Sequence, residues 1–194
     1  MPYLVRMRTI LRPAAAALVL FAALAATGCT PGPAKPHTLA PSSTPLFASD
    51  EEALAAAEEA YAAYQTTEDQ IFAEGGVEGE RIRPVAVREA RKAAINGFRS
   101  FMKNGYRATG LTRFDTFELQ EYEPGASDGE DVVSVYVCLD FSQTDVLDSN
   151  GRSVVTPGRA LRQPFQLRFD NAAGADKIVL SSREPWTDSG QCVI

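Results

Sequence analysis

The chain of 194 residues contains few of the residues on which enzyme chemistry usually depends, with one histidine, one tryptophan and three cysteines. The one histidine, His37, lies among prolines, so we expect neither a Ser-His-Asp triad nor a Cys-His pair. Glycine-rich phosphate-binding motifs are missing as well. With 19 basic and 25 acidic residues and a pI near 4.9, the chain also lacks the basic surface that nucleic acids require. We therefore predict no cofactor, no metal site and no nucleic-acid partner.

The sequence has no apolar run long enough to cross a bilayer as a helix. Its longest run, residues 14–26, has 13 residues, whereas a spanning helix needs about 20. Three arginines precede this run and the sequence AATGC ends it, which resembles a secretory signal with a lipobox. We predict a lipoprotein signal peptide at residues 1–28 and lipidation of Cys29. The alternative is an ordinary secretory cleavage site beside a cysteine.

Removal of residues 1–28 takes away three arginines and no acid, which changes the net charge from −6 to −9. Residues 29–49 contain five prolines and predict a semi-extended tether, and residues 50–194 predict a single folded domain. Because anionic head groups would repel the acidic chain on average, attachment must come from the lipid. We expect the domain to lie on the extracytoplasmic face of the cell membrane.

Two helices of opposite charge are expected at the start of this domain. Ser49 and Glu52 form a capping box, and an apolar stripe predicts a helix that ends at Gly75-Gly76. Pro84 predicts the first turn of a second helix, which ends at Asn104-Gly105. The first helix carries eight acids and no base, whereas residues 81–107 carry a net charge of +7. We expect the two helices to pack together and partly neutralise each other; the alternative is a basic face for anionic lipid or a wall polymer.

Alternating apolar residues predict strands after the second helix. The clearest strand is residues 131–142, in which Val133, Val135, Val137, Leu139 and Phe141 share one face. Shorter patterns predict strands at 117–120, 164–169 and 177–182, with Pro164 at an edge or a bulge, and Asn150-Gly151 predicts a hairpin turn. Helices followed by an antiparallel sheet indicate an α+β fold.

Several short motifs in this order resemble a family of actinobacterial exported lipoproteins. The motifs are the lipobox, the proline tether, Cys138-x-Asp140-x-Ser142, Asp148-x-x-Gly151, and a terminal Trp186 and Cys192. These proteins resemble the nuclear transport factor 2 cone (the cystatin-like cone), and the likeness covers residues 50–194. The resemblance implies a curved antiparallel sheet wrapped around helices. It does not imply one activity, because this fold hosts enzymes, binding proteins and assembly modules.

The candidate pocket is lined by large apolar side chains on the inner side of the cone. We assign it Tyr61, Tyr64, Phe98, Val135 and Val137, and the alternative is that these residues are plain core. Asp140 and Tyr136 fall on the outer face of their strand, where a buried catalytic base is not expected, so we predict no enzyme. The predicted role is binding of a hydrophobic small molecule or a protein partner; the alternatives are an accessory envelope subunit with a filled core and, less favoured, a cone-fold isomerase or hydrolase.

A cavity distinguishes these hypotheses. An apolar cavity of about 300 Å³ or more behind the 133–141 face favours ligand binding, and a filled core favours the accessory role. A carboxylate inside the cavity would favour an enzyme. Separately, use of Cys29 for lipid leaves Cys138 and Cys192 as a pair in an exported domain, which predicts a disulfide between them. The alternative is two buried free thiols.

Overall fold

The computed structural model describes residues 45–172, 177–187 and 192. The predicted signal peptide, Cys29, His37 and most of the predicted tether lie outside these residues. The described part of the chain is α+β, with two α-helices followed by an antiparallel sheet. None of the helices in the described part is both long and apolar enough to cross a membrane.

Helix α1 (Asp50–Ala73) begins directly after its predicted cap, Ser49, and ends two residues before the predicted stop at Gly75-Gly76. The Ser49 side chain accepts a hydrogen bond from the backbone N–H of Glu52, and the Glu52 carboxylate accepts one from the N–H of Ala48. The cap is therefore reciprocal, although Glu52 reaches one residue further back than the usual capping box. The ordered structure also extends upstream of α1, because Phe47, within the predicted tether, is only 8% exposed and packs in the core.

Helix α2 (Arg88–Asn104) begins four residues later than predicted. After α1, the 3₁₀-helix η1 (Gly79–Ile82) leads into a short extended segment in which Ala86 pairs with Leu180 at the edge of the sheet. Pro84 belongs to this connection and not to the helix, because the chain first satisfies its backbone groups on the sheet edge. The predicted stop is confirmed, since Gly105 ends α2 with a φ of +66°, where glycine is favoured.

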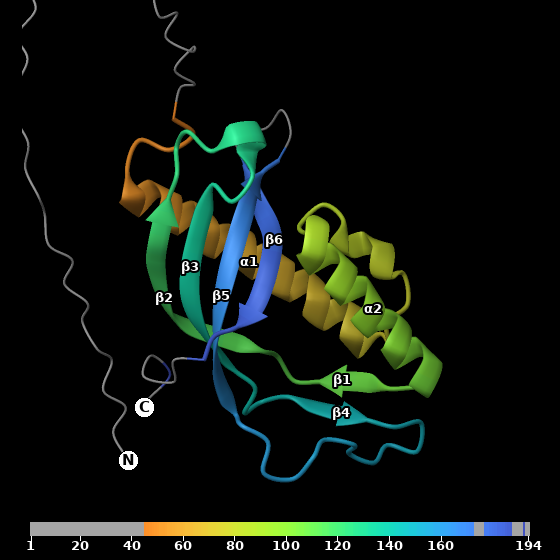
Figure 1. Ribbon diagram of the computed structural model, residues 1–194. Helices are drawn as coiled ribbons and strands as arrows, with labels where there is room; N and C mark the ends of the chain where they lie inside the picture. The colour runs from red at the N-terminus through yellow and green to blue at the C-terminus, as the bar shows by residue number, and fades with distance from the viewer. Residues whose placement is uncertain (1–44, 173–176, 188–191, 193–194) are drawn as a thin grey trace, which may run out of the picture. The chain divides into compact units, whose positions relative to one another are not determined.

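The sheet is curved and antiparallel, with the strand order β2-β3-β5-β6. Its strands are β2 (Arg113–Tyr122), β3 (Val133–Asp140), β5 (Arg162–Asn171) and β6 (Ile178–Pro185). The short 3₁₀-helix η2 (Ser127–Gly129) lies between β2 and β3. Strand β1 (Arg107–Thr109) pairs separately with β4 (Asp145–Leu147), and the predicted turn at Asn150-Gly151 follows β4. In Figure 1, α1 crosses behind this sheet and α2 lies beside β6.

Pro164 lies in an interior strand, so its predicted place at an edge is wrong. It stands opposite Cys138 of β3, near the beginning of β5. Its carbonyl accepts a hydrogen bond from the N–H of Trp186, just past the end of β6. The backbone groups of Pro164 thus point toward the β6 side, so the missing N–H removes nothing from the β3 ladder.

The two faces of β3 have the predicted assignment. Val133, Val135, Val137 and Leu139 are at most 2% exposed and form the core with α1. On the other face, Cys138 forms a disulfide with Cys192, with Cα atoms 5.5 Å apart, which confirms the predicted pairing.

The expected packing of the two helices is present, because Phe72 of α1 contacts Phe98 and Phe101 of α2. The expected neutralisation is limited to the ion pair between Glu74 and Arg81, which lie in the connection between the helices, and no described ion pair joins α1 to α2 themselves. The acidic residue of α1 with a described ion pair, Glu68, binds Arg183 of β6. At the other helix, Arg88 binds acids of the sheet and of the turn before β3. The reason is geometric: α2 lies beside β6, and its first turn meets the sheet before it meets α1.

Candidate ligand-binding site

A cavity of about 210 Å³ lies between the C-terminal half of α1 and the β1–β4 end of the sheet. One part of its wall is apolar and is formed by Phe72, Phe101, Leu139, Phe141 and Phe165. The other part is polar and includes Gln65, Glu68, Asp69, Thr112, Arg159 and Arg183. An apolar cavity with a few convergent polar groups is the usual form of a small-molecule site.

The centre of the polar wall is an ion pair between Glu68 of α1 and Arg183 of β6. The two terminal guanidinium nitrogens of Arg183 donate to the two carboxylate oxygens at 2.7 and 2.9 Å. Tyr64 donates a third hydrogen bond to Glu68 at 2.6 Å, and its ring lies 5.3 Å from the guanidinium carbon. Burial by itself lowers the pKa of Arg183, but the Glu68 carboxylate and the tyrosines outweigh it and raise the pKa further above its usual value. Arg183 therefore stays charged at neutral pH.

A second polar row runs beside the first along α1. Tyr61 donates to Gln65 at 3.1 Å, and Gln65 donates to Asp69, also at 3.1 Å. Asp69 accepts two further hydrogen bonds, from the backbone N–H and the hydroxyl of Thr112. Burial raises the pKa of the Asp69 carboxyl, and the hydrogen bonds from Thr112 and Gln65 only partly offset this effect. Burial likewise raises the pKa of Tyr61 to about 12.

Arg159, which comes from the connection between β4 and β5, also lines the cavity. Its guanidinium donates to the carbonyl of Phe141 at 2.9 Å and to the carbonyl and hydroxyl of Thr144. These bonds hold the chain just after β3 in place. The cavity therefore has fixed walls, because each polar side chain described above is already held by protein partners.

The five predicted pocket residues lie behind this site and do not line it. Tyr61, Tyr64, Phe98, Val135 and Val137 are all at most 2% exposed and belong to the hydrophobic core. Tyr61 and Tyr64 nevertheless support the site, because their hydroxyls orient Gln65 and Glu68.

The outer face of β3 carries no comparable site. Asp140 accepts a hydrogen bond from the backbone N–H of Ser142 at 2.8 Å and lies 3.4 Å from Arg162. The Ser142 contacts, followed by the Arg162 charge, lower the pKa of Asp140. Arg162 also binds Asp115 of β2 at 2.6 Å, so it joins three strands. Asp140 is thus a structural residue, in agreement with its predicted role.

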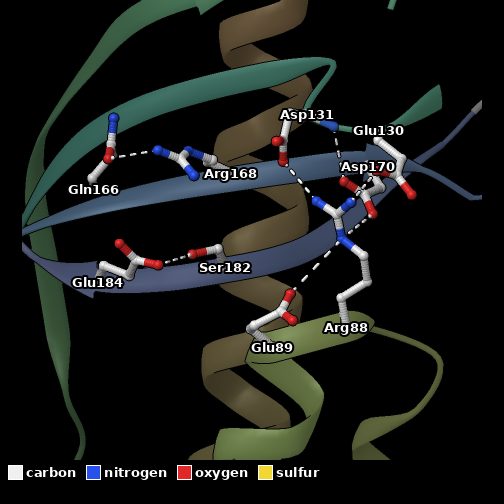
Figure 2. A network of polar contacts seen from close by, with 9 residues as sticks. All are labelled: Arg88, Glu89, Glu130, Asp131, Gln166, Arg168, Asp170, Ser182 and Glu184. Atoms are coloured by element: carbon white, nitrogen blue, oxygen red, sulfur yellow. Dashed lines mark hydrogen bonds and ion pairs between the residues drawn. The ribbon is translucent and has the colours of Figure 1, made fainter. Parts of the chain in front are cut away.

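A second polar cluster fixes the beginning of α2 to the sheet (Figure 2). Arg88 lies 2.5 Å from Glu130, 2.8 Å from Asp131 and 3.1 Å from Asp170. Asp170 also accepts a hydrogen bond from the N–H of Asp131. The arginine occupies the position among the carboxylates where a cation would bind, and the described residues contain no cluster that could hold a metal ion. We therefore interpret this cluster as a structural clamp.

The residues of the polar wall were missed in the sequence. Each hydrogen-bonded pair along α1 is separated by four residues, which places both side chains on one side of the helix. The pairs are Tyr61–Gln65, Tyr64–Glu68 and Gln65–Asp69. That spacing was visible in the sequence. The partner Arg183 was not, because it is 115 residues away from Glu68 in the chain.

No protein-family model and no curated protein matches this chain. Among solved structures, a chain from Catenulispora acidiphila is similar at 15% sequence identity and a TM-score of 0.41. The match covers 69% of this chain and 93% of that chain.

Proposed function

We propose that this protein is a lipid-anchored extracytoplasmic binding protein whose cavity beside Glu68 and Arg183 takes a small amphipathic molecule. The observation that carries the proposal is the cavity lining, which combines aromatic side chains with a charged, prearranged pair. The anchor is Cys29, and the helix-then-sheet order supports a relationship to the nuclear transport factor 2-like cone.

The ligand differs from the purely hydrophobic molecule expected from the sequence. The cavity is smaller than 300 Å³, and the inner face from Val133 to Leu139 is filled by core side chains. A ligand therefore needs a compact apolar part for the phenylalanine side. It also needs a polar group that can accept from the N–H groups of Arg183 that are not donated to Glu68.

Two carboxylates, Glu68 and Asp69, line the cavity, which is the observation that favours an enzyme as the second candidate. A catalytic base must have an oxygen available to the substrate. Both oxygens of each carboxylate already accept hydrogen bonds from protein donors. We therefore favour binding over catalysis, and the filled inner face keeps the accessory role as an alternative outcome.

Native mass spectrometry of the exported protein tests the ligand proposal. Ala108 of β1 lines the cavity, so Ala108→Leu should fill it and remove a co-purifying small molecule. Ala93→Leu, at an exposed position of α2, is the matched control and should retain the ligand. A folded Ala108→Leu protein with the same bound mass as the parent would refute this site. No bound mass in either protein, together with no chemical-shift change at the cavity on addition of small amphipathic fragments, would favour the accessory role.

Lipid attachment is tested separately by Cys29→Ala. We expect the variant to remain an uncleaved precursor or to be released, and to carry no metabolically incorporated fatty acid. A variant that is cleaved normally and still carries lipid would contradict the anchor.

A further inference from the structure

Helix α2 presents a row of basic side chains that the domain itself does not use. The row, which we call the α2 basic face, consists of Arg91, Lys92, Arg99 and Lys103. Within the described ranges, no hydrogen bond or ion pair involves any of these four side chains, whereas Arg88 of the same helix is held by three carboxylates. Lys92, Arg99 and Lys103 are exposed, and Arg91 is half-buried.

The helical repeat places Lys92, Arg99 and Lys103 on one side, whereas Arg91 lies about 100° away from Lys92 around the helix, at the margin of the buried side. Lys92 and Arg99 are seven residues apart, and Lys103 follows four residues later, so all three lie within about 16 Å along the helix. The opposite side of α2 is buried through Ala90, Ala94 and Phe98. Burial of these three residues explains why the basic face is directed outward.

The basic face also carries an exposed apolar side chain. Met102 is 52% exposed and lies three residues after Arg99, beside the charges. The apolar side of α2 is buried in the domain, so its contact with an anionic membrane would be electrostatic, with Met102 adding apolar contact at the margin. By contrast, the whole chain has a net charge of −6, so this face is a local exception on an acidic protein.

We propose that the α2 basic face docks the domain on the anionic head groups of the bilayer to which the protein is attached. The proposal rests on the lipid anchor at Cys29 for its location. Fifteen residues lie between Cys29 and Pro45, and the 16 steps along the chain span at most about 55 Å, so the domain can touch the bilayer. The net negative charge disfavours contact through the rest of the surface, and the α2 basic face selects the orientation.

The distribution of lysines allows a direct test with the full chain. The described residues contain Lys92 and Lys103 on the basic face and Lys177 at the start of β6, which serves as an internal reference. The protein, purified from membranes, is reconstituted into vesicles of phosphatidylcholine alone or with phosphatidylglycerol. A water-soluble amine-acetylating reagent is added, and mass spectrometry gives the labelling rate of each lysine.

We expect phosphatidylglycerol to slow acetylation of Lys92 and Lys103 by about threefold or more relative to Lys177, and 0.5 M salt to abolish the effect by screening. Arg91→Gln/Arg99→Gln should weaken this protection while both reporter lysines remain. Arg113→Gln/Arg152→Gln, which removes the same charge elsewhere, should leave the protection unchanged.

The outcomes separate docking from anchoring. A chain that floats with both vesicles but shows equal labelling refutes docking and leaves the anchor in place. If the protein floats only with vesicles that contain phosphatidylglycerol, and Lys92 and Lys103 are protected there, docking is supported and the anchor is refuted. If the protein floats with neither kind of vesicle, both docking and the anchor are refuted. If soluble polyglutamate at the same concentration of negative charge protects Lys92 and Lys103 from acetylation as well as the vesicles do, the bilayer is refuted as the partner of the α2 basic face and an acidic polymer is indicated.

Discussion

Replacement of Arg183 by methionine should strongly destabilise the domain. Glu68 is 5% exposed at its side chain and receives two of its three hydrogen bonds from Arg183. Loss of one partner of a buried ion pair costs about 3–5 kcal/mol, because the other charge stays buried without compensation. Since the Arg183 side chain is itself 26% exposed, water can replace part of the interaction. We therefore expect the low end of that range, about 3 kcal/mol.

The assay is urea and thermal unfolding, followed by circular dichroism, on a form without residues 1–28 and with Cys29→Ser. For a domain of this size, a loss of about 3 kcal/mol lowers the melting temperature by about 6–12 °C. Arg113→Met is the control, because Arg113 is exposed on β2 and forms no described ion pair; it should change stability by less than about 0.5 kcal/mol.

A double-mutant cycle identifies the cause. Glu68→Leu/Arg183→Met removes both charges and should recover about half or more of the loss seen for Arg183→Met alone, because an apolar pair of similar volume is often as stable as a buried ion pair. A loss below about 1 kcal/mol for Arg183→Met, or strict additivity of the two single variants, would refute the reasoning.

Three further predictions concern other parts of the domain. Replacement of Cys138 and Cys192 by alanine should lower stability by on the order of 4 kcal/mol at most, given the 54-residue separation, and alkylation of both thiols in the untreated exported protein would contradict the disulfide. Gly110 and Gly158 share a φ of +77°, but a Cβ at Gly110 would lie 1.7 Å from a backbone carbonyl oxygen whereas one at Gly158 meets nothing. In urea unfolding, Gly158→Ala should therefore cost about 1–2 kcal/mol and Gly110→Ala clearly more, and equal costs would refute the steric argument. Hydrogen bonds from Arg162 lower the pKa of Asp115. The ionised Asp115 therefore adds to the free energy of unfolding above its unfolded pKa of about 3.9, and this stabilisation disappears as the pH falls through the pKa of the folded protein. Asp115→Asn should consequently show a smaller drop in the urea midpoint between pH 5 and pH 2, and an unchanged drop would contradict this.

The main elements of the fold were predictable because local patterns determine them. The capping residues at Ser49 and Glu52 specify where α1 begins, and the strict alternation around Val135 specifies both the strand and its buried face. The beginning of α2 was misplaced because Pro84 fits a first helical turn equally well, and only the pairing of Ala86 with Leu180 decides against it. That pairing joins residues 94 positions apart, so no local pattern contains it.

The site was less predictable than the fold for the same reason. The aromatic residues Tyr61 and Tyr64 stood out in the sequence, but large size and apolar character are equally typical of core, where the structure places them. The cavity depends on polar residues that have no motif of their own. Glu68 resembles any other acid of an acidic helix until Arg183 is folded against it.

The charges of α1 and α2 show most clearly what the net charge of a segment leaves out. The opposite net charges of the two helices suggested mutual neutralisation, but a net charge does not specify which side of a helix carries it. In α1, one buried acid binds the sheet; in α2, Arg88 binds acids near the sheet, while the later basic residues face outward. Burial of Ala90, Ala94 and Phe98 holds the opposite side of α2 against the domain, and this directs Lys92, Arg99 and Lys103 outward. Arg88 fixes the first turn of α2, but core packing on the opposite side of the helix, and not the clamp, determines where the α2 basic face points.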